Sequence, residues 1–180
     1  NGAGQLNIIN SGVFTNSGTA NYNGSSATPV TWGGSGLATF SNTGILSKNI
    51  GSLATQGMSG NLAFSNTGTV NINSGTFQLT SSGADSGNYN LATAAETLQM
   101  VSGNRSFTNV ALTGPGNFIQ SGGTLTMSAA YTQAATGEPV WNMTGGTLTN
   151  TGGMTLNGLF NWDSGTINGA GVLTTTTTST

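Results

Sequence analysis

The sequence predicts an all-β fold in which short parallel strands wind into a single-stranded parallel β-helix, or β-solenoid. Three observations lead to this prediction. Apolar and polar residues alternate over short stretches, glycines regularly interrupt these alternations, and similar segments recur at sequence offsets between 19 and 24. A period of about 20 residues with about three corners is typical of one coil of a parallel β-solenoid.

Composition excludes several classes of protein. The chain has 180 residues with 30 Gly, two basic and four acidic side chains, and a net charge of -2. Two cations cannot neutralise a nucleic-acid backbone, so we expect no nucleic-acid partner. Because Cys and His are absent, thiol catalysis, disulfides and Cys/His zinc sites are excluded. No apolar run reaches the roughly 18 residues of a membrane-spanning helix, so none is expected.

Residues that form helices readily are scarce. The abundant Gly costs about 1 kcal/mol against Ala in a helix, and Ser, Asn and Thr compete for backbone hydrogen bonds. The segment 91–98 (LATAAETL) is the one place where we expect a helical turn. The rest of the chain is typical of short strands separated by turns.

The expected strands share one pattern along the chain. Apolar residues at i and i+2 place both side chains on one strand face, and the Gly that follows can adopt a positive φ and turn the chain. In chain order, these apolar positions are Leu6 and Ile8, Val13, Leu62 and Phe64, Val70 and Ile72, Phe77 and Leu79, Leu125 and Met127, Leu148, Met154 and Leu156, Phe160 and Trp162, and Ile167.

Longer repeats predict which strands stack. The sequence Ser-Asn-Thr-Gly occurs at 41–44 and again at 65–68, an offset of 24. Thr124 and Thr147 begin similar elements at an offset of 23, and Thr147 and Thr166 are 19 apart. At about 20 residues per coil we expect about eight or nine coils, about 40 Å long, with an apolar column inside and Asn and Thr ladders at the corners.

Some segments do not follow the repeat. Residues 23–34 and 127–140 break it and are expected to be loops or lateral excursions. We assign 1–173 to the solenoid domain and the Thr-rich 174–180 to an edge strand or a linker. With no initiator Met or signal peptide, the chain is expected to be a mature or excised segment. The structural alternative is an antiparallel β-sandwich, which also has short strands and frequent turns.

The sequence offers little for catalysis. Its carboxylates are Asp85, Glu96, Glu138 and Asp163, and the last two are 25 apart, close to one coil. A polysaccharide-cleaving enzyme would need such a pair in contact, but we interpret all four as solvated in turns and expect no catalytic residue. Clustered carboxylates for a metal and a dinucleotide-binding context are both missing, so no metal site and no cofactor are expected.

Other side chains are candidates for modification or binding. Sequons make Asn23, Asn104 and Asn142 candidate glycosylation sites. The Thr-x-Thr elements at 124–126 and 147–149 resemble ice-binding arrays, but two copies do not make a flat array. Aromatic residues could stack on sugars, although packing in the core or at its rim is the preferred interpretation; they are Trp32, Trp141 and Trp162.

The segments 121–127 (SGGTLTM), 144–150 (TGGTLTN) and 163–174 (DSGTINGAGVLT) resemble repeats in large bacterial surface proteins. These proteins include autotransporter passengers and filamentous-haemagglutinin-like adhesins. The resemblance covers most of the chain loosely and is best from residue 113 onward. It implies a secreted, right-handed β-helix that serves as a stalk, adhesin or fibre.

These observations lead to one expected function and several alternatives. We expect a non-enzymatic extracellular structural protein, a β-solenoid subunit or segment of a cell-surface fibre or stalk. An almost uncharged surface is suited to packing against copies of itself, and open terminal coils present strand edges that pair with the next subunit. The main alternative is an adhesin that recognises glycans or surfaces. Ice binding and polysaccharide degradation are less favoured.

Overall fold

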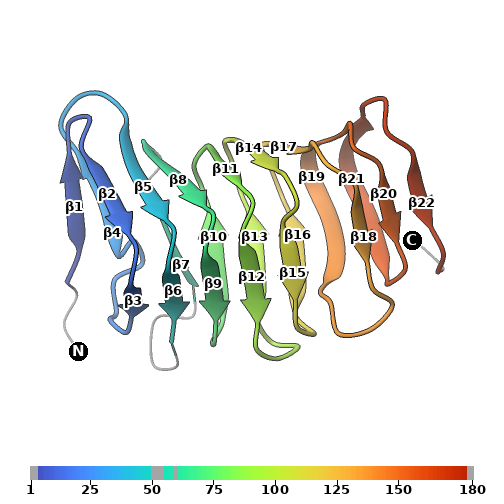
Figure 1. Cartoon of the computed structure of the whole chain (residues 1–180), viewed down its shortest axis with the longest axis horizontal. Helices are drawn as coiled ribbons and strands as arrows, with labels where there is room; N and C mark the ends of the chain where they lie inside the picture. Colours follow the sequence, from blue (N-terminus) through green and yellow to red (C-terminus); the bar gives the residue numbers. More distant parts are fainter. Residues whose placement is uncertain (1–3, 50–54, 59–60, 178–180) are drawn as a thin grey trace.

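The structure, a computed structural model, describes residues 4–49, 55–58 and 61–177. Within them the chain forms a parallel β-solenoid of about seven turns without a helix. Figure 1 shows the rungs stacked along the long axis, from β1 (Leu6–Ile9) at the N-terminal end to β22 (Leu173–Thr175) at the C-terminal end. The predicted eight or nine coils are too many, because some coils are longer than expected: the coil that starts at Thr15 returns to the same place only at Ser41.

Three strands make up each rung, and equivalent strands stack into three faces of the column. The first face contains β1, β4 (Val30–Gly33), β7 (Thr55–Gly57), β10 (Thr76–Leu79), β13 (Thr97–Met100) and β16 (Asn117–Gln120). The second face contains β2 (Val13–Asn16), β5 (Ala38–Asn42), β8 (Leu62–Asn66), β11 (Gly83–Asp85), β14 (Asn104–Phe107) and β17 (Thr124–Met127).

The third face contains β3 (Thr19–Tyr22), β6 (Ile45–Lys48), β9 (Thr69–Ile72), β12 (Asn88–Leu91) and β15 (Ala111–Thr113), followed by β18 (Tyr131–Gln133), β20 (Met154–Leu156) and β22. Two long strands, β19 (Val140–Asn150) and β21 (Phe160–Asn168), continue from the first face into the second. All strand pairs among the described residues are parallel, so the antiparallel sandwich is wrong.

The repeats that the sequence revealed are stacked rungs. Ser41 lies opposite Ser65 in the β5–β8 pair. Thr124 lies opposite Thr147, and Thr147 lies opposite Thr166. All three predicted offsets are therefore confirmed: each one is the number of residues between paired positions of adjacent rungs.

The core is a thin column of apolar side chains that point inward from the three faces. Rings stack from rung to rung: the centroids of Phe14 and Phe40 are 5.3 Å apart, and those of Phe40 and Phe64 are 5.5 Å apart. A second series of rings includes Phe118 and Trp141, with centroids 4.5 Å apart. Burying one such side chain contributes about 1.5–3 kcal/mol, and only stacked coils remove both sides of each ring from water. The predicted column of large apolar residues is confirmed.

The corner between the second and third faces carries an amide ladder. Asn16 Nδ2 donates to Asn42 Oδ1 at 2.7 Å, and Asn42 Nδ2 donates to Asn66 Oδ1 at 2.8 Å. Each Asn precedes a Ser or Thr and then a Gly. A Cβ on Gly68 would lie 2.2 Å from the carbonyl oxygen of Gly44, so only glycine fits where the backbones of adjacent coils approach this closely.

The expected helical turn at 91–98 is wrong. The segment is a turn that leads from β12 into β13. Glu96 accepts a hydrogen bond from the backbone N–H of Thr93, and the Thr93 hydroxyl accepts one from the N–H of Ala95. These bonds resemble the cap of a helix, but no helix follows because Thr97–Met100 pairs with strands on both sides.

The irregular segments are partly as expected. Residues 23–29 form a loop before β4, and 134–139 form a loop before β19. Between residues 127 and 140, however, the chain also forms β18, which pairs with β20. Of the Thr-rich tail, Thr174 and Thr175 lie in β22, which pairs with β20, and residues 178–180 lie outside the described residues.

Candidate functional site

The acidic residues do not share one environment. Asp85 and Glu96 are buried, Glu138 is half-buried and Asp163 is exposed. The interpretation that all four are solvated is therefore wrong for the first two. The sequence alone could not distinguish the buried from the exposed carboxylates, because each lies next to turn residues. Asp85 and Glu96 are buried because adjacent coils of the folded chain cover them.

Glu138 and Asp163, the pair considered for polysaccharide cleavage, do not lie opposite each other in adjacent rungs. Asp163 lies in an irregularity of β21, between Trp162, which is opposite Met143, and Ser164, which is opposite Thr144. Glu138 precedes β19 and accepts a hydrogen bond from the Tyr131 hydroxyl at 3.3 Å. The register therefore places Asp163 beside Met143 and Thr144 in the adjacent rung. Glu138 lies five residues before Met143, so the two carboxylates are not opposite each other. Among the described residues, no three Asp or Glu cluster as a metal site.

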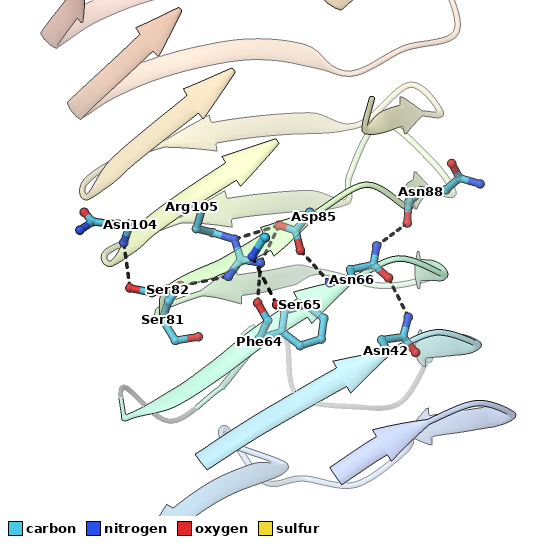
Figure 2. A network of polar contacts seen from close by, with 11 residues as sticks. Asn42, Phe64, Ser65, Asn66, Ser81, Ser82, Asp85, Asn88, Asn104 and Arg105 are labelled. Atoms are coloured by element: carbon cyan, nitrogen blue, oxygen red, sulfur yellow. Dashed lines mark hydrogen bonds and ion pairs between the residues drawn. The ribbon is translucent and has the colours of Figure 1, made fainter. Parts of the chain in front are cut away.

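A buried polar cluster crosses the second face near the middle of the column (Figure 2). Arg105 Nη2 and Nε donate to Asp85 Oδ2 at 2.6 and 3.0 Å, and the side chains of this ion pair are fully buried. The guanidinium also donates to the backbone oxygens of Ser81 and Phe64 at 3.0 and 2.9 Å. The other carboxylate oxygen, Oδ1, accepts the backbone N–H of Asn66 at 2.8 Å.

This cluster is structural in character. Its charged atoms are enclosed by protein and have no access to a ligand. Burial raises the pKa of the Asp85 carboxyl, and the adjacent Arg105 guanidinium opposes the rise. The sequence carried a signal that was missed: Arg105 alternates with the apolar Phe107, so strand parity places both on the inner face.

Lys48 is the second buried cation. Its Nζ donates to the backbone oxygen of Ser74 at 2.6 Å. Burial lowers the pKa of this amine, and the negative charge of Glu96 partly restores it. Lys48 follows the apolar Ile45 and Leu46 in β6 and occupies the same register as Ile72, which is an apolar core position.

The N-terminal end of the column is hollow. A cavity of about 460 Å³ opens there. Its walls are inward-facing apolar side chains of the first rungs, including Leu6, Phe14, Ala20, Val30 and Phe40. Leu6 is 38% exposed and Phe14 is half-buried, whereas Phe40 one rung further is buried. The first rung therefore presents core residues that no described rung covers.

The C-terminal end is uncovered in the same way. Trp162 is in register with the buried Met143, so its side chain also points toward the column interior. It is nevertheless 49% exposed. Ile167 and Leu173, in register with the buried Leu148 and Met154, are only partly buried. Both ends of the described column thus end in unburied core side chains.

The outer side of the second face carries rows of small hydroxyl and amide groups. Thr124, Thr147 and Thr166 form one row, and a parallel row runs through Thr126 and Thr149. Strand residues that alternate with these side chains point inward and are buried, as in β17. The preceding rung extends the rows with Asn104 and Ser106, so the array covers more coils than the two Thr-x-Thr elements predicted.

The candidate glycosylation sites differ in accessibility. Asn23 is exposed in a loop and accepts a hydrogen bond from Asn49 at 2.8 Å. Asn104 is exposed at the start of β14. Asn142 lies inside β19, where its Oδ1 accepts a hydrogen bond from Asn161 at 2.7 Å. Asn23 and Asn104 are therefore the accessible candidates.

The tryptophans take three positions. Trp141 is in the core, Trp162 is at the rim of the C-terminal end, and Trp32 is half-buried with its indole N–H donating to the backbone oxygen of Asn10 at 3.2 Å. Packing in the core or at its rim therefore accounts for Trp141 and Trp162.

Comparison of the chain with protein-family models, with curated proteins and with solved structures finds no match. The described residues contain no helix that is long and apolar enough to span a membrane.

Proposed function

We propose that the chain is a non-enzymatic extracellular structural protein, a β-solenoid segment of a surface fibre or stalk that is lengthened by end-to-end stacking. The observation that carries this proposal is the state of the two ends. Both present parallel strand edges and inward-facing apolar side chains that only a further rung would bury. Unpaired edges of this kind are templates for pairing with another chain.

The symmetry of the contact supports a fibre over a closed oligomer. All strand pairs among the described residues are parallel, so the edge of the first rung and the edge of the last rung differ and complement each other. A contact between two different ends is heterologous, and when its rotation does not close a ring it generates a filament. The nearly uncharged surface, with a net charge of -2, offers little repulsion between copies.

Two neighbouring residues of β22 provide the test. Leu173 faces the interior and is partly buried, whereas Thr174 is exposed on the outside. Leu173→Lys places a charge in the stacking contact and is expected to abolish concentration-dependent association in sedimentation velocity, because an unpaired buried charge is strongly unfavourable. Thr174→Lys adds the same charge outside the contact and leaves association unchanged. Equal behaviour of both variants and the wild type would contradict the proposal.

The second candidate function is binding of an uncharged glycan or a repetitive surface by the second face. The rows through Thr124 and Thr126 favour it, because they repeat hydroxyl groups at the rung spacing of about 4.8 Å. Thr147→Arg would interrupt the array at its centre. Loss of glycan-array signals in this variant with unchanged association supports the candidate, and a wild-type array without hits removes the glycan version of it.

A further inference from the structure

The three faces of the column present polar side chains outward, and they differ in how these groups are hydrogen-bonded. On the first face, Gln78 Nε2 donates to Gln99 Oε1 at 3.0 Å, and Gln99 Nε2 donates in turn to the Ser121 hydroxyl at 3.0 Å. On the third face, Asn90 Nδ2 donates to Asn71 Oδ1 at 3.4 Å. Amide groups on these two faces therefore bond to the side chains of neighbouring rungs.

The second face carries two rows of hydroxyl groups that the protein leaves free. Thr124 lies opposite Thr147 in one row, and Thr126 lies opposite Thr149 in the other. Thr166 follows Thr147 in the first row. The hydroxyls of these five threonines form no hydrogen bond with any other described residue. Each therefore offers a donor and an acceptor that only solvent or a ligand satisfies.

A third row of hydroxyls, next to the corner with the third face, is different. The Ser128 hydroxyl donates to the backbone oxygen of Phe107 at 3.2 Å, and the Thr151 hydroxyl donates to that of Met127 at 3.1 Å. These hydroxyls hold adjacent rungs together at the corner. The free hydroxyls are therefore confined to the two rows within the strands.

The fold fixes the positions of these free hydroxyls. Rungs are about 4.8 Å apart, and positions i and i+2 of one strand are about 6.7 Å apart. Leu125 and Leu148 alternate with the threonines and are buried, so the strands are anchored in the core. Threonine is β-branched, which restricts rotation of its side chain. With Asn104 and Ser106 before them and Asn168 after them, the rows span four rungs.

The chemistry of these rows suits ordered water better than a sugar. None of the eight outward side chains is charged or aromatic; they are Asn104, Ser106, Thr124, Thr126, Thr147, Thr149, Thr166 and Asn168. Sites for organic ligands are typically concave and lined by apolar and aromatic side chains. A hydroxyl, by contrast, donates and accepts hydrogen bonds as each water molecule of ice does. The two repeats of the rows are also close to those of the water oxygens on a prism face of ice.

We propose that the second face binds ice through these two rows. Their hydroxyls hold water molecules at positions that continue the crystal, and the adsorbed protein stops growth of the crystal beneath it. The sequence disfavoured this function because only two Thr-x-Thr elements are visible in it, whereas the register aligns four rungs. The inference uses the face of the second candidate function and commits its repetitive surface to ice; it does not depend on end-to-end assembly.

Thr147→Arg and Thr155→Arg form a matched pair of variants. Thr147 lies at the centre of the free hydroxyls, whereas Thr155 lies between Thr132 and Thr174 in a single row on the third face. Thr147→Arg is expected to raise about tenfold or more the protein concentration that inhibits ice recrystallisation, because a long charged side chain interrupts the contact. Thr155→Arg should leave that concentration unchanged. Circular dichroism verifies that each variant is folded.

A second measurement follows the protein on ice directly. Fluorescently labelled wild-type chain is expected to coat a single ice crystal and to be incorporated as the crystal grows, whereas labelled Thr147→Arg should remain in the liquid. Thr126→Arg alters the other row and is expected to behave as Thr147→Arg does, because a crystal face contacts both rows.

The outcomes distinguish this inference from the proposed function. A wild-type chain that neither adsorbs to ice nor inhibits recrystallisation would overturn the inference, whether or not it forms filaments. Equal losses in Thr147→Arg and Thr155→Arg would overturn the assignment to the second face. Glycan-array signals that disappear in Thr147→Arg, without adsorption to ice, would assign the face to a sugar instead. Adsorption to ice by a chain that stays monomeric would support the inference and contradict end-to-end assembly.

Discussion

The Asp85–Arg105 pair shows how a chain with six charged side chains uses two of them. Both side chains are fully buried. Removing two charges from water carries a penalty of several kcal/mol for each, and only good geometry with further hydrogen bonds offsets it. Arg105 meets this condition, because its donors reach one carboxylate and two backbone oxygens. The two residues are held in adjacent rungs, so the pair specifies which rungs stack.

Arg105→Met tests this role. The substitution leaves the Asp85 carboxylate buried without its cation, so we expect a loss of about 3–5 kcal/mol in the free energy of unfolding. Adding Asp85→Leu in the same chain should recover much of the loss, because an apolar pair needs no counter-charge. Urea denaturation measures both. Asp163→Asn, at an exposed carboxylate, is the control and should change stability by less than about 0.5 kcal/mol.

All three tyrosines are buried, and this predicts the response to alkaline pH. Burial raises the pKa of Tyr22, Tyr89 and Tyr131 above the ordinary value. The folded pKa is the higher one, so the stabilisation is fully present below pH about 10 and is lost as pH rises beyond it. Each tyrosine should then lower the free energy of unfolding by about 1.4 kcal/mol per pH unit.

An alkaline titration checks this response. Tyrosinate absorbance and the loss of β-sheet circular dichroism should appear together above pH about 10, and Tyr22→Phe should shift the unfolding midpoint upward. Ionisation of all three tyrosines near pH 10 with the sheet intact would show that they are accessible to solvent.

At the scale of the strand and the corner, glycine sets how closely coils approach. A Cβ on Gly68 would lie 2.2 Å from the oxygen of Gly44 and 2.7 Å from the carbonyl carbon of Thr43. Both are backbone atoms of the adjacent rung and cannot move without separating the coils. Gly18 occupies the first rung of the same corner, and a Cβ there would meet nothing within 4 Å.

Gly68→Ala and Gly18→Ala form a matched pair. The first is expected to lower the free energy of unfolding by about 1–3 kcal/mol, as overpacking does, and the second to change it by less than about 0.5 kcal/mol. Thermal and urea unfolding give the two values. Equal losses would mean that the cost comes from backbone entropy alone and not from the close approach of the coils.

The same scale shows what the sequence could predict. Strand alternation and repeat offsets predicted the rungs correctly, because inward side chains and corner glycines repeat with the coil: the Ser41–Ser65 and Thr124–Thr147 pairs are examples. Coil length varies, however, so the number of turns was overestimated. Segment 91–98 had helix-like composition, but pairing on both sides of β13 prevailed. The uncovered ends required three dimensions, because only the register of successive rungs shows that Leu6 and Trp162 continue rows of buried core residues.

At the scale of the whole molecule, the described column has a direction, and its first and last rungs differ. The N-terminal end is concave and lined with apolar side chains, and the C-terminal end presents Trp162. The faces between them bear few charges and many hydroxyl and amide groups, which suits close lateral neighbours as well as water. A column of this kind is suited to spanning distance, because each added rung lengthens it by about 4.8 Å.

Electron microscopy of the purified chain over a range of concentrations tests the central claim most directly. The account predicts unbranched filaments with the width of one column, which lengthen as concentration rises and whose rungs continue across subunit boundaries with the spacing of about 4.8 Å. Isolated particles one column long at every concentration would contradict it.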